Sequence, residues 1–240
     1  MRRFDDEDLT DAQFRECDLS RARLVGVVLQ DVEIDGLVTH LVVNGVEVMT
    51  YVEAELDRRQ QVRLLIGSAD PADLREAWQQ LRQAWATTTE RARSMPEGSE
   101  HHGVDGEWSM VETTRHLVFV HDSWFRRCVL GLTEPFTAMG LASRFVPDQE
   151  ELGLDRSARP DLREVLTVRD RQASEIEAWL AEVTPEQLAK TAPVPDDYRW
   201  PPYAKGRRVQ QCLGTVLNEE WEHHGVCVRD LNKLSHRGAS

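Results

Sequence analysis

Large apolar residues recur every five positions along the first 35 residues of the chain. The positions between them are mostly Asp, Glu, Arg, Gln and Ser. A period of five fits neither an α-helix nor a β-strand. It is typical of a square solenoid, in which each five-residue step forms one side and its central side chain points inward. The seven central positions are Phe4, Leu9, Phe14, Leu19, Leu24, Leu29 and Ile34.

This segment resembles the pentapeptide-repeat family, whose fold is a right-handed β-helix. At four steps per coil, residues 4–35 complete fewer than two turns, whereas stacked repeats usually need at least about three units to be stable alone. We therefore expect a short β-helix that depends on the rest of the protein. Long acidic solenoids of the family mimic duplex DNA, but this one is too short for that role, so we expect a structural cap or an interaction module.

The residues after the repeat predict a hairpin and then a short helix. Leu37–Val52 is rich in β-branched residues on both sides of Asn44-Gly45, which is a strong hairpin signal. The charged stretch Glu53–Leu65 predicts a short helix. The repeat and hairpin thus make up a predicted first domain, residues 1–52, and residues 53–69 a helical linker.

Helical periodicity dominates the chain from residue 70 onward. Asp70 and Pro71 are suited to the N-cap and first position of a helix, and Ser109 with Glu112 forms a capping-box pattern. Four long amphipathic helices, with one long connection between the second and third, predict a mainly α four-helix bundle over residues 70–235. The helices are expected over residues 71–93, 109–130, 161–182 and 209–234, with a further short helix from Thr184.

The last predicted helix carries two pairs of residues that could bind a metal ion. Glu219 and His223 are four residues apart, as are Glu220 and His224, and residues at this spacing share a helix face. On the second helix, His116 lies in an otherwise apolar stretch. One His from one helix and a Glu-x3-His pair from another would give a three-ligand site that leaves coordination positions open.

Other interpretations of these residues are open at this stage. A single His on an apolar face is more often a hydrogen-bonded core residue, and Glu-x3-His pairs are common on exposed helices. The apolar stripe of the last helix is centred nearer to Glu220 and His224 than to Glu219 and His223, so periodicity favours the former pair. Candidate hydrogen-bond acceptors for a ligating His are Asp122, Glu112 and Asp230, and candidate carboxylate-binding residues are Arg126, Arg127, Arg207 and Arg208.

Composition narrows the classes of partner. The formal net charge is −13, so we expect no binding to nucleic acid or to an anionic membrane through a general basic field. No apolar run approaches the about 20 residues that span a bilayer, and the first residues lack the apolar stretch of a signal peptide. We therefore expect a cytoplasmic protein. Its cysteines form no CxxC pair and are expected to be reduced; they are Cys17, Cys128, Cys212 and Cys227.

Two short motifs about a hundred residues apart point to a family. They resemble motifs of the DinB-like metalloprotein superfamily, over about residues 70–235. That superfamily includes thiol-dependent S-transferases and the mycothiol-dependent maleylpyruvate isomerase, and its fold is a four-helix bundle. Its metal site takes one His from the second helix. The last helix supplies two further ligands four residues apart, of which the first is His or Glu and the second is His. The resemblance thus implies His116, Glu219 and His223 as metal ligands. The motifs are Trp108-Ser109, Glu112 and His116-Leu117, then Glu219, His223-His224-Gly225 and Arg229-Asp230-Leu231.

The resemblance also implies a chemistry. We expect a divalent metal, with Zn or Ni as first candidates and Mn or Fe as others, and a low-molecular-weight thiol that binds there as thiolate. The predicted function is a transferase or isomerase acting on a small molecule; a hydrolase that uses metal-bound water is a further candidate. Catalytic and thiol-binding side chains are not assigned. The alternative function is a non-catalytic metal-binding or protein-interaction module with a structural pentapeptide cap, for example in a homodimer.

Overall fold

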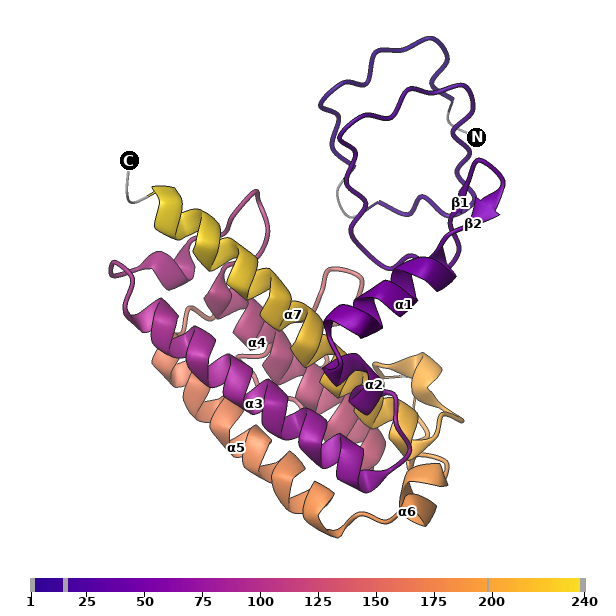
Figure 1. Ribbon diagram of the computed structural model, residues 1–240. Helices are drawn as coiled ribbons and strands as arrows, with labels where there is room; N and C mark the ends of the chain where they lie inside the picture. The colour runs from indigo at the N-terminus through magenta and orange to yellow at the C-terminus, as the bar shows by residue number, and fades with distance from the viewer. Residues whose placement is uncertain (1–2, 15–16, 198, 238–240) are drawn as a thin grey trace. The chain divides into compact units, whose positions relative to one another are not determined.

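The computed structural model describes residues 3–14, 17–197 and 199–237, and these are mainly helical (Figure 1). The chain divides into two compact units, Met1–Met49 and Thr50–Ser240. The mainly α architecture, with a repeat segment before the helices, agrees with the predicted fold class. Within the described residues, no helix has both the length and the apolar character needed to cross a membrane.

In the N-terminal unit, a backbone corner with positive φ returns every five residues. Each corner lies two residues after one of the central apolar positions. Non-glycine residues rarely adopt this conformation, so its regular return supports the five-residue period as a structural repeat. Position 16, where the remaining corner is due, lies outside the described residues. The corners are Asp6, Asp11, Arg21, Gly26, Asp31 and Gly36.

The central apolar side chains of the repeat stay largely open to solvent. Their exposed fractions lie between 44% at Leu9 and 63% at Leu24. Residues 3–14 and 17–41 form broad coils without a β-strand, as Figure 1 shows. A solenoid coil buries its central residues only when further coils stack on it, and fewer than two coils are present. The five-residue corners are therefore formed without a closed apolar core.

The predicted hairpin is present but shorter than expected. Strand β1 (Val42–Val43) pairs antiparallel with β2 (Val46–Glu47). Asn44 and Gly45 connect them with φ values of 50° and 84°. Both values are left-handed, as the two central residues of a type I′ hairpin turn require.

The prediction of one helix over Glu53–Leu65 is wrong in two respects: the helix begins earlier, and it is interrupted. Helix α1 (Met49–Arg59) begins earlier because the Glu47 side chain accepts a hydrogen bond from the backbone N–H of Met49. After a break at Gln60-Gln61, the chain continues as α2 (Val62–Ile66). In α2, Arg63 forms ion pairs with Glu53 and Asp57 of α1.

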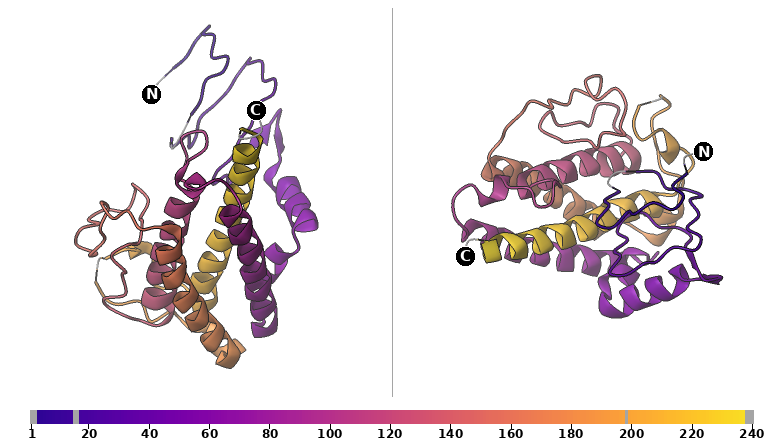
Figure 2. Two further views of the ribbon diagram at one scale, coloured as in Figure 1. Left: turned by 90° about the vertical axis from the view of Figure 1, so that its left-hand side faces the viewer. Right: turned by 90° about the horizontal axis from the view of Figure 1, so that it is seen from above.

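Four long helical segments form the bundle of the second unit (Figures 1 and 2). Asp70 caps the first with Pro71 at its first position, and Ser109 and Glu112 form the predicted capping box of the second. Their apolar faces pack into two core clusters, the larger of which includes Leu74, Trp78, Phe125, Ile176, Leu213 and Leu217. The segments are α3 (Pro71–Arg93), α4 (Met110–Val120) with its continuation η2, α5 (Leu162–Glu182) and α7 (Val209–Arg237); the short helices are η1 (Ser99–His101), α6 (Pro185–Ala189) and η3 (Pro202–Ala204).

The second long helix changes its hydrogen-bonding pattern halfway. A single α-helix to Leu130 was predicted, but α4 ends at Val120 and continues as the π-helix η2 (His121–Val129). The backbone N–H of Leu130 donates to the carbonyl of Phe125, five residues back. A π-turn holds more residues than an α-turn, and eight of the nine residues of η2 are buried. The prediction assumed the α-helical period and therefore missed this change.

The long connection between η2 and α5 is fixed to α4 by one buried arginine. The Arg115 guanidinium donates to the carbonyl oxygens of Met139, Asp155 and Ala158. A small apolar cluster, which includes Phe119 of α4, packs under the same connection. The connection is therefore held at several points, and its residue Leu141 contributes directly to the site described next.

Candidate metal centre

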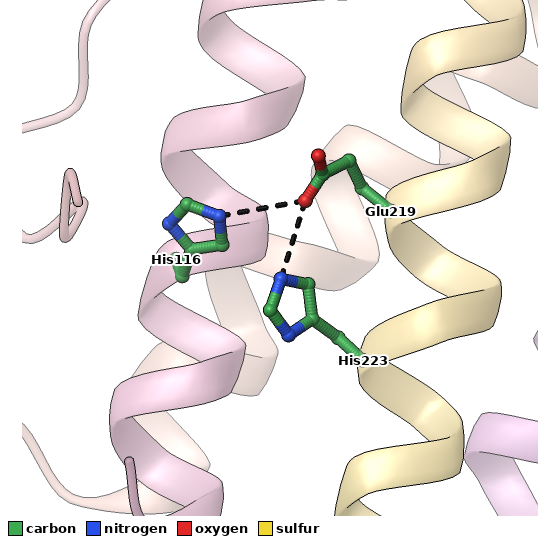
Figure 3. Close-up of side chains that lie close together, drawn as sticks. All are labelled: His116, Glu219 and His223. Carbon is green, nitrogen blue, oxygen red and sulfur yellow. Dashed lines mark ion pairs between the residues drawn. The ribbon is translucent and has the colours of Figure 1, made fainter. Parts of the chain in front are cut away.

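Three side chains from two helices converge at the edge of the bundle core (Figure 3). His116 comes from α4, and Glu219 and His223 come from α7. The Nε2 atoms of His116 and His223 lie 3.5 Å and 3.2 Å from the same carboxylate oxygen of Glu219. One ligand atom from each residue lies within 4.8 Å of the others, and among the described residues this is the only cluster of three such side chains.

The spacing of these atoms fits a small divalent cation. Bonds of about 2.0–2.2 Å in a tetrahedral site place neighbouring ligand atoms roughly 3.3 Å apart. The two separations from the Glu219 oxygen are close to that value. Two imidazole nitrogens and one carboxylate oxygen form a ligand set that zinc enzymes use, with a fourth position left for water or substrate. The donor set therefore fits a catalytic rather than a closed structural metal site.

The proton position on His116 also suits metal binding. Its Nδ1 lies 2.9 Å from the backbone carbonyl oxygen of Leu141. A carbonyl can only accept, so Nδ1 carries a proton, and Nε2 is the ring nitrogen that faces Glu219. Histidines that bind metals usually donate their other ring nitrogen in this way. The acceptor is a main-chain atom of the long connection, which side-chain patterns could not identify.

The three acceptors suggested by the sequence are engaged elsewhere. Asp122 accepts hydrogen bonds from the backbone of Thr137 and from Gln172, Glu112 completes the cap at Ser109, and Asp230 pairs with Arg229. None of them therefore takes the role predicted for it.

The site combines a charged carboxylate with partial access to solvent. Burial pushes the pKa of the Glu219 carboxyl upward, but hydrogen bonds and charges from His116 and His223 outweigh it and hold the pKa at about 2. The side chains of Glu219, His223 and His116 are 31%, 23% and 11% exposed. The Trp108 ring lies 4.8 Å from the His116 ring and 6.4 Å from the His223 ring, between centroids. Trp108 thus packs against both imidazoles, while the carboxylate remains accessible.

The alternative pair on α7 has other partners. Glu220 is buried and forms an ion pair with Arg169 of α5. The Nε2 atom of His224 lies 2.8 Å from the Thr88 hydroxyl. The apolar stripe correctly indicated that this pair faces the core, but the pair beside the stripe is the one that meets His116. The structure therefore brings Glu219 and His223, not Glu220 and His224, to His116.

Two of the four candidate carboxylate-binding arginines are already paired. Arg126 pairs with Glu175 and Asp122, and Arg127 pairs with Asp197. Arg208 is exposed, while Arg207 lies over the Trp124 ring. Arg126 and Arg127 are therefore engaged with acids of the protein itself.

Outside the cluster, His121 provides a test of the burial of η2. Its Nε2 lies 3.2 Å from Glu175, and burial lowers its pKa from 6.5 to about 4. The imidazole of His121 therefore binds a proton more tightly in the unfolded chain than in the folded one. The stability contributed by neutral His121 is thus present above pH 6.5 and is lost as pH falls toward 4. We expect the free energy of unfolding to fall by roughly 3 kcal/mol more in the wild type than in His121→Gln between pH 7 and pH 4.

Urea denaturation of both proteins at the two pH values measures this difference. Burial raises the pKa of the neighbouring Asp122 to about 6, which acts in the opposite direction. Because Asp122 is present in both proteins, the comparison isolates His121. Parallel pH profiles for the two proteins would show that His121 does not titrate as its burial implies.

Comparison with known families agrees with the resemblances in the sequence. A family model described as the DinB superfamily matches residues 80–227, more than half of the chain, and contains all three clustered side chains. A family model described as pentapeptide repeats (8 copies) matches residues 5–37. No curated protein and no solved structure matches the chain.

Proposed function

Because the chain belongs to the DinB superfamily, we propose that it is a metal-dependent transferase or isomerase that uses a low-molecular-weight thiol. His116, Glu219 and His223 hold the divalent ion, with Zn or Ni as the first candidates. The observation that carries this proposal is the meeting of the three ligand atoms, with the Nδ1 proton of His116 donated to Leu141. The substrate is a small cytoplasmic molecule, and the repeat segment is a structural cap.

Each residue of the site has a distinct task in this proposal. A divalent ion bound there lowers the pKa of a coordinated thiol or water. Glu219 supplies a negative charge at neutral pH, since its pKa is about 2. Leu141 fixes the orientation of His116, and Trp108 packs against both imidazoles. The partly exposed side of Glu219 and His223 is the side from which a small molecule approaches.

The nucleophile is expected to come from outside the protein. The cysteine nearest along α7, Cys227, packs in an apolar cluster with Trp85 and Leu231. Burial raises the pKa of the Cys227 thiol to about 12, so it stays protonated and unreactive at neutral pH. This favours a small-molecule thiol over a protein thiol.

Metal analysis followed by a thiol screen tests the proposal. Protein purified without a histidine tag is expected to contain nearly one divalent ion per chain. The metal-loaded protein should either transfer an added thiol to an electrophile or isomerise the electrophile, and it should do neither without thiol. His223→Ala should abolish this turnover. A chain that binds no metal after incubation with each ion would refute the proposal.

The exposed apolar row of the repeat favours a second candidate, a non-catalytic interaction module. Bound metal without thiol-dependent turnover, together with a dimer that dissociates when Leu19 and Leu24 are replaced by Ser, would support that alternative. Turnover that needs metal but no thiol would indicate a hydrolase instead.

A further inference from the structure

Arg207 is a partly buried arginine without an acidic partner among the residues that the structure describes. Its guanidinium carbon lies 5.0 Å from the centre of the Trp124 ring. Its Nη2 makes only long contacts, 3.4 Å to the carbonyl of Gln211 and 3.5 Å to the hydroxyl of Thr215. The other arginines of the bundle that are no more than partly exposed have shorter hydrogen bonds or an acidic partner. Arg75 and Arg115 donate to backbone carbonyls and Arg91 to Asn232 and Ser235. Those paired with a carboxylate include Arg126, Arg127, Arg169 and Arg229. Arg207 differs from them in combining an aromatic ring beside its guanidinium with only long hydrogen bonds.

The backbone holds Arg207 close to the metal centre. Its carbonyl accepts a hydrogen bond from Ala192, and its N–H donates to Ala204, which fixes the residue just before α7. The guanidinium reaches Thr215, and Thr215 and Glu219 are neighbours one turn apart on α7, about 5–6 Å between Cβ atoms. The guanidinium therefore contacts the residue that lies one turn before Glu219 on α7.

Tyr203 lies within electrostatic range of both groups. Burial raises the pKa of its hydroxyl, the charge of Arg207 lowers it, and the charge of Glu219 raises it again. The net shift is upward, so the hydroxyl is a hydrogen-bond donor at neutral pH. The Tyr203 ring lies 5.6 Å from the Trp124 ring and 5.3 Å from the Trp200 ring, so an aromatic surface accompanies the two donors.

An open groove of about 680 Å³ lies near Arg207. It lies between α2 and α7, and its walls include Gln211, Thr215 and Asn218. Arg207 contacts the first two of these residues. Arg207 and the three clustered side chains do not line this groove, so it adjoins the guanidinium only through Gln211 and Thr215.

We infer that Arg207 and Tyr203 form a carboxylate-binding subsite of the metal centre. A guanidinium binds a carboxylate through two parallel hydrogen bonds, and the aromatic rings suit an apolar or aromatic body beside it. The ligand class is a small molecule whose carboxylate is a few atoms from its reacting atom. This inference rests on the proposed function. The carboxylate can belong to the thiol or to the second substrate, and the experiment separates these sources.

The first arm of the test measures thiol binding to the full chain loaded with Co²⁺. Thiolate-to-cobalt absorption is followed while 3-mercaptopropionate or 2-mercaptoethanol is added. The wild type is expected to bind the carboxylate-bearing thiol at least about tenfold more tightly, the usual effect of a charge-assisted hydrogen-bonded pair. Arg207→Gln should reduce this preference to within about twofold, while the exposed neighbour changed in Arg208→Gln serves as the matched control and should keep it.

The second arm uses phenylacetate, which carries a carboxylate but no thiol, and measures its binding to the same proteins by calorimetry. Loss of about tenfold in affinity in Arg207→Gln alone would assign the carboxylate to the second substrate. Arg207→Lys, which keeps the charge but not the planar fork, should show an intermediate loss in whichever arm responds, and thermal unfolding checks that each variant is folded.

The outcomes separate the subsite from the proposed function. If the wild type binds Co²⁺ but Arg207→Gln and Arg208→Gln behave alike in both arms, the subsite is refuted and the metal site stands. If the wild type binds no Co²⁺, the proposed function and the subsite fall together. Arg207-dependent binding of phenylacetate without any thiolate absorption would support the subsite and contradict the role of the thiol.

Discussion

Replacement of either His116 or His223 by alanine is expected to lower the affinity for Zn²⁺ by more than about a hundredfold. Loss of a mere outer partner of a ligand typically costs 10–100-fold, and each of these residues would supply a ligand atom itself. Glu219→Gln should have a comparable effect, because it removes the negative charge that both imidazoles face. Competition with a chromophoric chelator measures the affinities.

His224→Ala is the matched control for this prediction. It removes an imidazole next to His223 in the sequence, but that ring contacts Thr88 and Trp85 instead of the cluster. Its affinity for Zn²⁺ should stay within about threefold of the wild type, a bound well below the cost of losing an outer partner. Equal losses in His223→Ala and His224→Ala would mean that the ligand set is assigned wrongly.

The second large effect is expected on stability, at the buried ion pair between Arg169 and Glu220. Arg169→Met leaves the Glu220 carboxylate buried without its partner, which typically costs about 3–5 kcal/mol. One carboxylate oxygen of Glu220 already lacks a hydrogen-bond partner, so no neighbour stands ready to compensate. Urea denaturation of the metal-free proteins measures the loss.

The double variant Arg169→Met/Glu220→Leu separates this interpretation from a simple packing defect. Replacing both charges with apolar side chains is often neutral or stabilising, so most of the lost stability should return. A double variant as unstable as Arg169→Met would show that the arginine acts through packing. Affinity for Zn²⁺ should be unchanged in folded double-variant protein, since neither residue belongs to the cluster.

The bundle could be predicted because its signals are local. A helix start depends on a few consecutive residues, and Asp70-Pro71 and Ser109 with Glu112 both occur where α3 and α4 begin. The five-residue period likewise marks the repeat without any knowledge of distant contacts. The α-helical period alone does not distinguish an α-helix from the π-helix after Val120, because that choice depends on what the neighbouring helices bury.

The site was harder to predict. The apolar stripe identifies the residues at the centre of the core, whereas the clustered residues of α7 lie beside that stripe. Glu220 lies in that stripe, and its charge is neutralised there by Arg169 from another helix. Glu219 lies beside the stripe, where a carboxylate can meet both His116 and solvent. Choosing between them required the family resemblance. Arg169 is 51 residues away from Glu220 in the sequence, so the spacing of residues along α7 does not reveal that the two form a pair.

The hydrogen bond from His116 to Leu141 has a consequence for how the site can evolve. The acceptor is a main-chain oxygen, so any residue that keeps the local backbone path can occupy position 141. Related sequences are therefore expected to vary freely there while the histidine stays invariant. A comparison of related sequences would then overlook a true member of the site. Insertions or deletions between Met139 and Asp155, by contrast, should be strongly selected against, because they would displace the oxygen itself.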